Sequence, residues 1–269
     1  MRQNEAAGLG RGASIGLALQ AFLSRLVQPF LYPVYILLLR YVLAYRVPDL
    51  KSVRRSIREA LKRHRKQPLL ICPNHLTMID SVILMWAITP WWHAFWDYRY
   101  FPWNTPEKTN YAHIPVLRLF AYLGKCVAVV RQAPKEQTRR FLAKIRALLL
   151  RGHSLMIFPE GKRSRDGRVD TRNFAYGTGK IVDDLQRLGS QPRILCVYLR
   201  GVGQETYGTI PRKGETFYVD FRVMEPESAY RGLRAQRDIS RQIVETLAEM
   251  EDAFFSGAAR LGRRLRMVQ

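Results

Sequence analysis

The first part of the chain is dominated by one long apolar stretch. Residues 26–45 are apolar apart from Gln28 and Arg40. This length approaches the ~20 residues that span a bilayer, while its two prolines, its arginine and its four tyrosines also suit the lipid interface. We expect two helices over residues 15–46 that form a membrane-embedded or interfacial anchor. The alternative is a hydrophobic helix buried in a soluble core.

A basic amphipathic pattern follows the apolar stretch. Apolar residues recur at helical spacing among lysines and arginines, at Leu50, Val53, Ile57 and Leu61. They predict a helix over 51–66, which can lie on anionic lipid or pack on the domain with its charges in water. Both interpretations stay open. Residues 1–14, which are polar and rich in glycine, are expected to be a flexible tail, and 15–66 the helical membrane-associating region.

Short apolar runs alternate with helical patterns over residues 67–256. Strands are expected at 69–72, 126–130, 154–158, 194–199 and 216–223, and helices near 81–88, 134–150, 177–188 and 234–255. The last strand alternates apolar and polar residues, which is typical of an edge strand. The pattern predicts an α/β domain with a mainly parallel central sheet flanked by helices, after the N-terminal helical membrane anchor. A basic tail, 257–269, ends the chain.

Charge narrows the range of partners. Lys and Arg number 44 against 22 Asp and Glu, so the net charge is +22 and the sequence pI is about 10.5. Such a charge attracts nucleic acid, an anionic membrane surface or an acidic carrier protein. The aromatic residues lie mostly in apolar runs and no nucleic-acid-binding motif is present, so we expect an anionic membrane surface and no nucleic acid. A basic membrane-binding protein without catalytic activity is one alternative.

The cysteines and histidines do not form a metal-binding pattern. Cys72, Cys126 and Cys196 are widely spaced and each lies in an apolar run, which predicts buried free thiols in a reducing compartment. The five histidines are scattered. We therefore expect no metal.

Candidate catalytic residues follow the first predicted strand. Asn74, His75 and Asp80 lie where a strand gives way to a helix, at the edge where ligands bind in open α/β sheets. His75 suits a general base, and Asp80 can hold its other ring nitrogen. Since no G-x-S-x-G pattern supplies a nucleophile, such a pair would activate a hydroxyl of the substrate. Taken singly, His75 can be an ordinary loop histidine, and Asp80 can cap the helix in a capping box with Thr77.

A second candidate loop follows the predicted strand 154–158. It holds Glu160, Gly161, Lys162, Arg163 and Ser164. The glycine allows close approach of a ligand to the backbone, and the cations offer donors for a phosphate. Arg131, at the end of the strand 126–130, is expected at the same edge. A solvated basic turn is the alternative for this loop.

Together these residues resemble the glycerophospholipid acyltransferase family, which contains the 1-acylglycerol-3-phosphate acyltransferases. The resemblance covers residues 65–225 and rests on four motifs: N-H-x4-D at Asn74-His75…Asp80, F-P-E-G-x-R-S over 158–164, a weaker match at Gly124…Arg131, and a weak one at Leu195-Cys196-Val197. The chain departs from the family at Lys162, where threonine is usual, and at Val130, where aspartate is usual. The fourth motif also lacks its proline.

The resemblance implies roles for these residues. His75 would be the catalytic base and Asp80 its partner, while Arg131 and Arg163 would bind the phosphate or carboxylate of the acceptor. The wider set of substrate-binding residues that it implies is Asn74, Lys108, Arg131, Glu160, Gly161, Lys162, Arg163 and Ser164. Lys108 enters by its spacing from Pro115.

The predicted function is transfer of a fatty acyl group in phospholipid biosynthesis. The donor would be acyl-CoA or acyl carrier protein, with no resident cofactor, and the acceptor the free hydroxyl of a lysophospholipid, with 1-acylglycerol-3-phosphate expected. The acyltransferase domain would be 67–256, at the cytoplasmic face of the cell membrane. Lys162 and the altered motif at Arg131 leave open an alternative acceptor, a lyso-aminolipid of the ornithine or glycine type.

Overall fold

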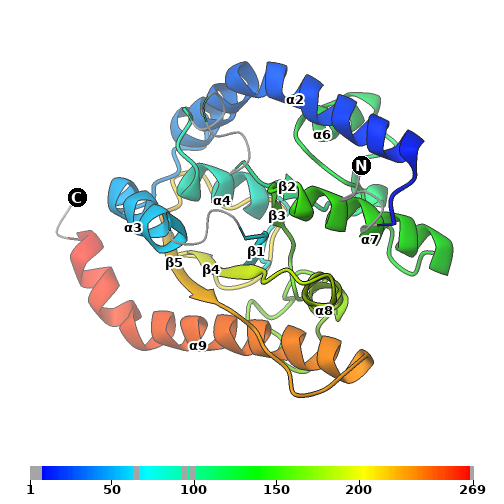
Figure 1. Ribbon diagram of the computed structural model, residues 1–269. Helices are drawn as coiled ribbons and strands as arrows, with labels where there is room; N and C mark the ends of the chain where they lie inside the picture. The colour runs from blue at the N-terminus through cyan, green and yellow to red at the C-terminus, as the bar shows by residue number, and fades with distance from the viewer. Residues whose placement is uncertain (1–7, 63–66, 93–95, 97–100, 267–269) are drawn as a thin grey trace.

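The structure is a computed structural model that describes residues 8–62, 67–92, 96 and 101–266. Its centre is a five-stranded sheet in the order β2-β3-β1-β4-β5 (Figure 1). The strands are β1 Leu69–Pro73, β2 Trp103–Asn104, β3 Ser154–Met156, β4 Arg193–Gly201 and β5 Phe217–Met224. Strands β1 to β4 are parallel, so their carboxyl ends meet at one edge.

The sheet is mixed, and the prediction of a mainly parallel sheet was wrong. β5 runs antiparallel to β4, and these two strands form the longest pairing of the sheet, from Ile194 opposite Met224 to Gly201 opposite Phe217. The alternation of residues 216–223 reports one exposed and one buried face but not the direction of a strand. Here β5 turns back directly beside β4, so no crossover helix separates them.

The expected strand 126–130 is absent from the sheet. This segment makes only isolated parallel bridges, Asn104 with Cys126 and Glu107 with Val129. Its partner β2 is two residues long, and Lys125 and Gln132 turn the chain at either end with φ of 56° and 54°. A continuous ladder therefore has no room to form, although the segment still runs beside residues 104–107.

Helices cover both faces of the sheet, as predicted. One face packs on α3 Leu50–Lys62 and α4 Asp80–Ile88, and the other on α7 Lys135–Leu150, α8 Gly177–Arg187 and α9 Leu233–Arg266. Neighbouring strand residues supply the two cores alternately, as Leu70 and Ile71 do. The helices expected near 81–88, 134–150 and 177–188 are confirmed. α9 continues into the expected tail 257–269, and residues 63–66 of the expected helix 51–66 lie outside the described residues.

The N-terminal region is one helical run where two helices were expected. α2 Arg11–Leu37 continues through the π-helical turn η1 Leu38–Val42 and crosses the top of the domain in Figure 1, with α6 Pro115–Leu123 behind it. It begins inside the expected tail 1–14, of which 1–7 lies outside the described residues. Among the described residues this run is the one helix long and apolar enough to cross a membrane, and 22% of its most apolar window is buried.

Candidate active site

The carboxyl end of β1 places a histidine beside a carboxylate. The Nδ1 atom of His75 lies 3.1 Å from Oδ2 of Asp80, the first residue of α4. The pair meets because His75 stays in the loop while Asp80 begins the helix. A hydrogen bond to the carboxylate places the proton on Nδ1 and leaves Nε2 with its lone pair. The His75 side chain keeps 19% of its exposure, so a substrate hydroxyl can approach it.

Asp80 is held by the loop that carries His75. Its Oδ2 accepts the backbone N–H groups of Leu76 and Thr77, each at 2.7 Å, and its Oδ1 accepts the hydroxyl of Thr77. The expected capping box is therefore half formed, because the Thr77 hydroxyl donates to the carboxylate and does not cap the helix. These three donors hold the buried carboxylate in place beside the imidazole, whose Nδ1 is the fourth donor.

Asn74 ties the same loop to β4. Its side-chain amide donates to the Leu199 carbonyl at 3.0 Å, and its side-chain oxygen accepts the Leu199 N–H at 2.7 Å. This buried amide continues the β1–β4 pairing past the end of the strand. Asn74 therefore fixes where the chain leaves the sheet, one residue before His75.

The loop after β3 forms the second side of the site. Glu160 is buried, its Oε1 accepts the His75 N–H at 2.9 Å, and its Oε2 accepts the Ser164 hydroxyl. The Ser164 N–H in turn donates to the His75 carbonyl at 2.9 Å. Burial raises the pKa of Glu160 from its ordinary value of 4.5 to about 7, against the opposing effect of these hydrogen bonds.

Two residues near Glu160 set the shape of this loop. Phe158 stacks on the His75 ring with 4.0 Å between ring centroids. Gly161 has φ of 68°, and a Cβ there would lie 2.8 Å from the Cβ of Ala175. Glycine therefore meets two requirements at this position, a left-handed backbone and a close neighbour.

Arg163 and Lys162 point to different partners. The Arg163 guanidinium donates to the Gly208 carbonyl at 3.0 Å and lies over the Tyr207 ring. The Gly208 N–H donates to the Leu76 carbonyl, so this segment also lines the His75 loop. Lys162 instead pairs with Asp170 at 2.9 Å.

Arg131 and Lys108 lie at the β2 side of the same edge. Arg131 is 59% exposed, and its Nε lies 3.0 Å from Oε2 of Glu107. Lys108 is exposed and begins the short 3-10 helix η3 Lys108–Asn110, anchored by its N–H to the Val129 carbonyl. No contact joins either cation to the His75–Asp80 pair among the described residues.

The sequence-predicted residues thus fall into two groups. The first consists of Asn74, His75 and Asp80 with the two residues that hydrogen-bond to the His75 backbone, Glu160 and Ser164. The second bonds to other parts of the described chain and consists of Lys108, Arg131, Gly161, Lys162 and Arg163. Sequence reasoning missed the part played by Tyr207 and Gly208, which lie beyond β4 and carry no motif. The parallel direction of β4 was the signal that this loop would reach the same edge.

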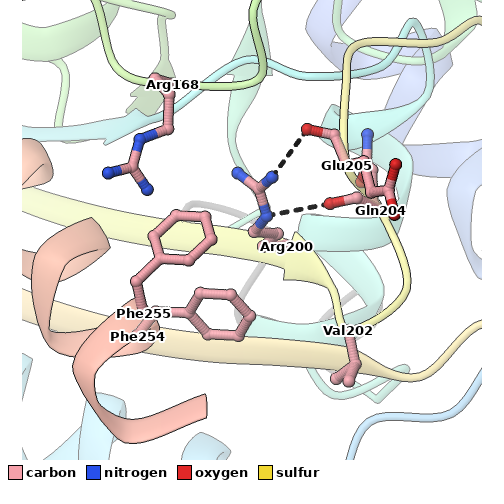
Figure 2. Close-up of a pocket in the computed structure, with 7 residues that line it drawn as sticks. All are labelled: Arg168, Arg200, Val202, Gln204, Glu205, Phe254 and Phe255. Carbon is pink, nitrogen blue, oxygen red and sulfur yellow. Dashed lines mark hydrogen bonds between the residues drawn. The ribbon is translucent and has the colours of Figure 1, made fainter.

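A pocket lies away from this pair, between β4 and α9. Figure 2 shows its lining, with the Arg200 guanidinium donating to the carbonyls of Gln204 and Glu205 and with Arg168 and Phe255 on the opposite side. Neither His75 nor Asp80 lines it. Because Arg200 is buried and bonded to loop carbonyls, its evident effect is to fix the loop after β4.

A buried carboxylate that orients an accessible histidine is an arrangement that can activate a substrate hydroxyl. The model of the acyltransferase family matches residues 52–213, and the chain belongs to this family, the family of the 1-acylglycerol-3-phosphate acyltransferases. Membership supports acyl transfer in lipid biosynthesis, with a lipid acceptor and an acyl donor. A comparison with curated proteins found no match.

Proposed function

We propose that this protein transfers a fatty acyl group from acyl-CoA or acyl carrier protein to the free hydroxyl of a lysophospholipid, with 1-acylglycerol-3-phosphate as the acceptor. The observation that carries the proposal is the 3.1 Å contact between His75 and a buried, fourfold hydrogen-bonded Asp80. The thioester is a co-substrate, so the reaction needs no resident cofactor. The apolar run α2–η1 would hold the enzyme at the cytoplasmic face of the membrane, where the acceptor resides.

His75 acts as the general base of the proposed reaction. Its Nε2 takes the proton of the acceptor hydroxyl as the oxygen attacks the thioester carbonyl. The carbon–oxygen bond forms, the carbon–sulfur bond breaks, and the leaving thiolate takes the proton back from the imidazolium. Asp80 stabilises the imidazolium between these two proton transfers.

The cations at this edge would bind the head group of the acceptor. Arg163 contacts the segment 207–208, which also contacts the His75 loop, so a phosphate bound to Arg163 would lie close to the base. Arg131 and Lys108 offer a second cluster at the β2 side. Lys162 already pairs with Asp170, and this contact favours a loop-ordering role for it.

The test is acyl transfer from labelled acyl-CoA and acyl carrier protein to a panel of lysolipids in mixed micelles. Wild type and His75→Ala are compared with Asp252→Asn, a change at an exposed carboxylate. We expect turnover on 1-acylglycerol-3-phosphate that His75→Ala abolishes. Turnover only on a lyso-aminolipid would keep the base and replace the acceptor. If no acceptor is acylated while vesicles are still bound, the protein is a membrane-binding protein and the proposal fails.

A further inference from the structure

The helix α2 buries three polar side chains and exposes large apolar ones. Gln20, Ser24 and Gln28 are buried against the domain beside Leu17 and Tyr32, with Gln28 completely inaccessible. On the outer side, Phe22, Leu26 and Phe30 are 59%, 55% and 76% exposed. A surface helix of a water-soluble protein buries its apolar side, so this arrangement indicates that the outer side of α2 meets an apolar environment.

The buried glutamines join α2 to the end of α6. The Gln20 amide donates to the carbonyls of Tyr122 and Cys126, at 3.0 and 2.9 Å, and the Gln28 amide donates to the Leu123 carbonyl at 2.9 Å. These carbonyls end α6 or follow it, where a helix has no internal donors left. α2 is thus held lengthwise along the domain.

A third contact holds the other end of α2. The Tyr32 hydroxyl is buried and lies 2.7 Å from the carbonyls of both Met85 and Thr89, at the end of α4. To cross a bilayer upright, α2 would have to leave all these partners and place its glutamines in hydrocarbon. Each unsatisfied polar group there costs several kcal/mol.

α6 continues the exposed apolar surface of α2. None of its nine residues is buried, although its sequence is PVLRLFAYL, and Leu119 is 57% exposed. The two helices are in contact, as their hydrogen bonds show and as Figure 1 displays. We call the outer sides of α2, η1 and α6 together the α2–α6 face.

Charge indicates what covers this face. No acidic residue occurs between Glu5 and Asp49, while Arg25, Arg40 and Arg118 are exposed on α2, η1 and α6. A second copy of the chain docked here would bring arginines of both copies together at one interface. An anionic lipid surface matches both the apolar side chains and the cations.

We propose that the α2–α6 face is a docking surface for one leaflet of an anionic phospholipid bilayer, with α2 lying in the plane of the membrane and α6 as a second inserted element. This orientation and the part played by α6 go beyond the proposed acyl transfer and do not depend on the acceptor. They also decide between the span and the interfacial helix that the apolar stretch left open.

The first test measures binding of the full chain to phosphatidylglycerol vesicles by flotation, without an acyl donor. We expect Leu119→Asp on α6 to weaken binding about tenfold or more, since a large apolar side chain leaves the lipid and a like charge replaces it. Leu233→Asp is the matched control, because Leu233 is 77% exposed at the start of α9, across the molecule from α2 (Figure 1). Circular dichroism verifies folding, and Val116→Asp repeats the test on α6.

Equal binding by Leu119→Asp, Val116→Asp and wild type would overturn the role of α6. If these variants changed only the sedimentation of the lipid-free protein, the face would be a dimer interface and the proposal would fail. His75→Ala should bind vesicles like wild type. Its binding therefore separates a failure of this proposal from a failure of the catalytic one.

The second test asks whether α2 crosses the bilayer. Cysteines are introduced singly at Arg11, the first residue of α2, and at Arg46, four residues after the end of η1, and the protein is added to preformed vesicles. A membrane-impermeant maleimide should modify both positions, as it does in detergent, with wild type reporting any background from the native thiols. Protection of the Arg11→Cys variant alone would show a span and overturn the in-plane orientation.

Discussion

The replacement Asp80→Asn tests the catalytic proposal most directly, because it removes a charge and keeps a shape. Oδ2 of Asp80 lies 3.1 Å from Nδ1 of His75. When His75 takes the acceptor proton, attraction between two unit charges at this distance is worth about 5 kcal/mol for an effective dielectric constant of about 20. Its loss from the transition state corresponds to a fall in kcat of about 10³- to 10⁴-fold.

The variant should still fold. An asparagine oxygen at the place of Oδ2 can accept the N–H groups of Leu76 and Thr77, and the Thr77 hydroxyl can turn to accept its NH₂ group. Hydrogen bonds to a neutral oxygen are weaker than those to a carboxylate, so we expect a loss of about 1–3 kcal/mol in the free energy of unfolding. The expected loss of transition-state stabilisation is therefore larger than the expected loss of fold stability.

The assay is steady-state acyl transfer in mixed micelles, with kcat and KM determined separately and stability measured by denaturant unfolding. Asp252→Asn is the matched control, since it makes the same chemical change at a side chain that is 78% exposed. If Asp80→Asn retains more than a tenth of the wild-type kcat while it folds normally, Asp80 does not stabilise an imidazolium and its assignment as the partner of His75 is refuted.

Three further predictions concern the second loop. Burial raises the pKa of Glu160 to about 7, so the folded state binds its proton more tightly than the unfolded chain and the stability of the fold falls as pH rises from about 4.5 to about 7. The melting temperature of Glu160→Gln should therefore rise relative to that of wild type over this range, and a difference in melting temperature that does not change with pH would contradict the raised pKa. Gly161→Ala should lower the free energy of unfolding by about 1–3 kcal/mol, more than Gly189→Ala does, because Gly189 has a similar φ but open space around it. Equal losses in denaturant unfolding would show that the close contact with Ala175 does not matter. Arg163→Ala should raise KM for 1-acylglycerol-3-phosphate about tenfold or more, and Arg187→Ala on α8 is the control. An unchanged KM would show that Arg163 does not bind the head group.

Much of the fold was predictable because local patterns and tertiary structure agree. The helices α4, α7 and α8 follow apolar patterns with clear starts and ends. The segment 126–130 was wrongly predicted as a strand of the sheet, because an apolar sequence indicates burial beside the sheet and does not show that the segment pairs with it. Strand pairing depends on a partner, and here the partner β2 has two residues. The direction of β5 could not be predicted either, since apolar and polar residues alternate in the same way in parallel and antiparallel strands.

The site shows the same division between local and distant information. His75 and Asp80 were predicted as a pair because five residues of sequence and one strand-to-helix turn determine their meeting. The contact between Glu160 and the His75 N–H joins residues 85 positions apart. Only the parallel pairing of β1 with β3 brings it about. The direction of β4 indicates that the loop after it reaches this edge, but not that Gly208 is the residue that contacts Arg163, because that contact uses a backbone carbonyl, which every residue has.

The position of α6 in the chain would connect the proposed membrane-binding face with the candidate site. Lys108 precedes α6 and Arg131 follows it, and both lie where the strands end. Glu107 and Arg131 pair at 3.0 Å, so the two connections that enter and leave α6 meet at the edge that also carries His75. If α6 lies in the leaflet, a lysophospholipid in that leaflet has its acyl chain beside α6 and its head group at the level of these cations. We therefore expect Leu119→Asp to raise KM for acceptors in vesicles while leaving KM for a short-chain, water-soluble acceptor nearly unchanged. An equal rise for both acceptors would show that α6 shapes the site itself and does not deliver the lipid.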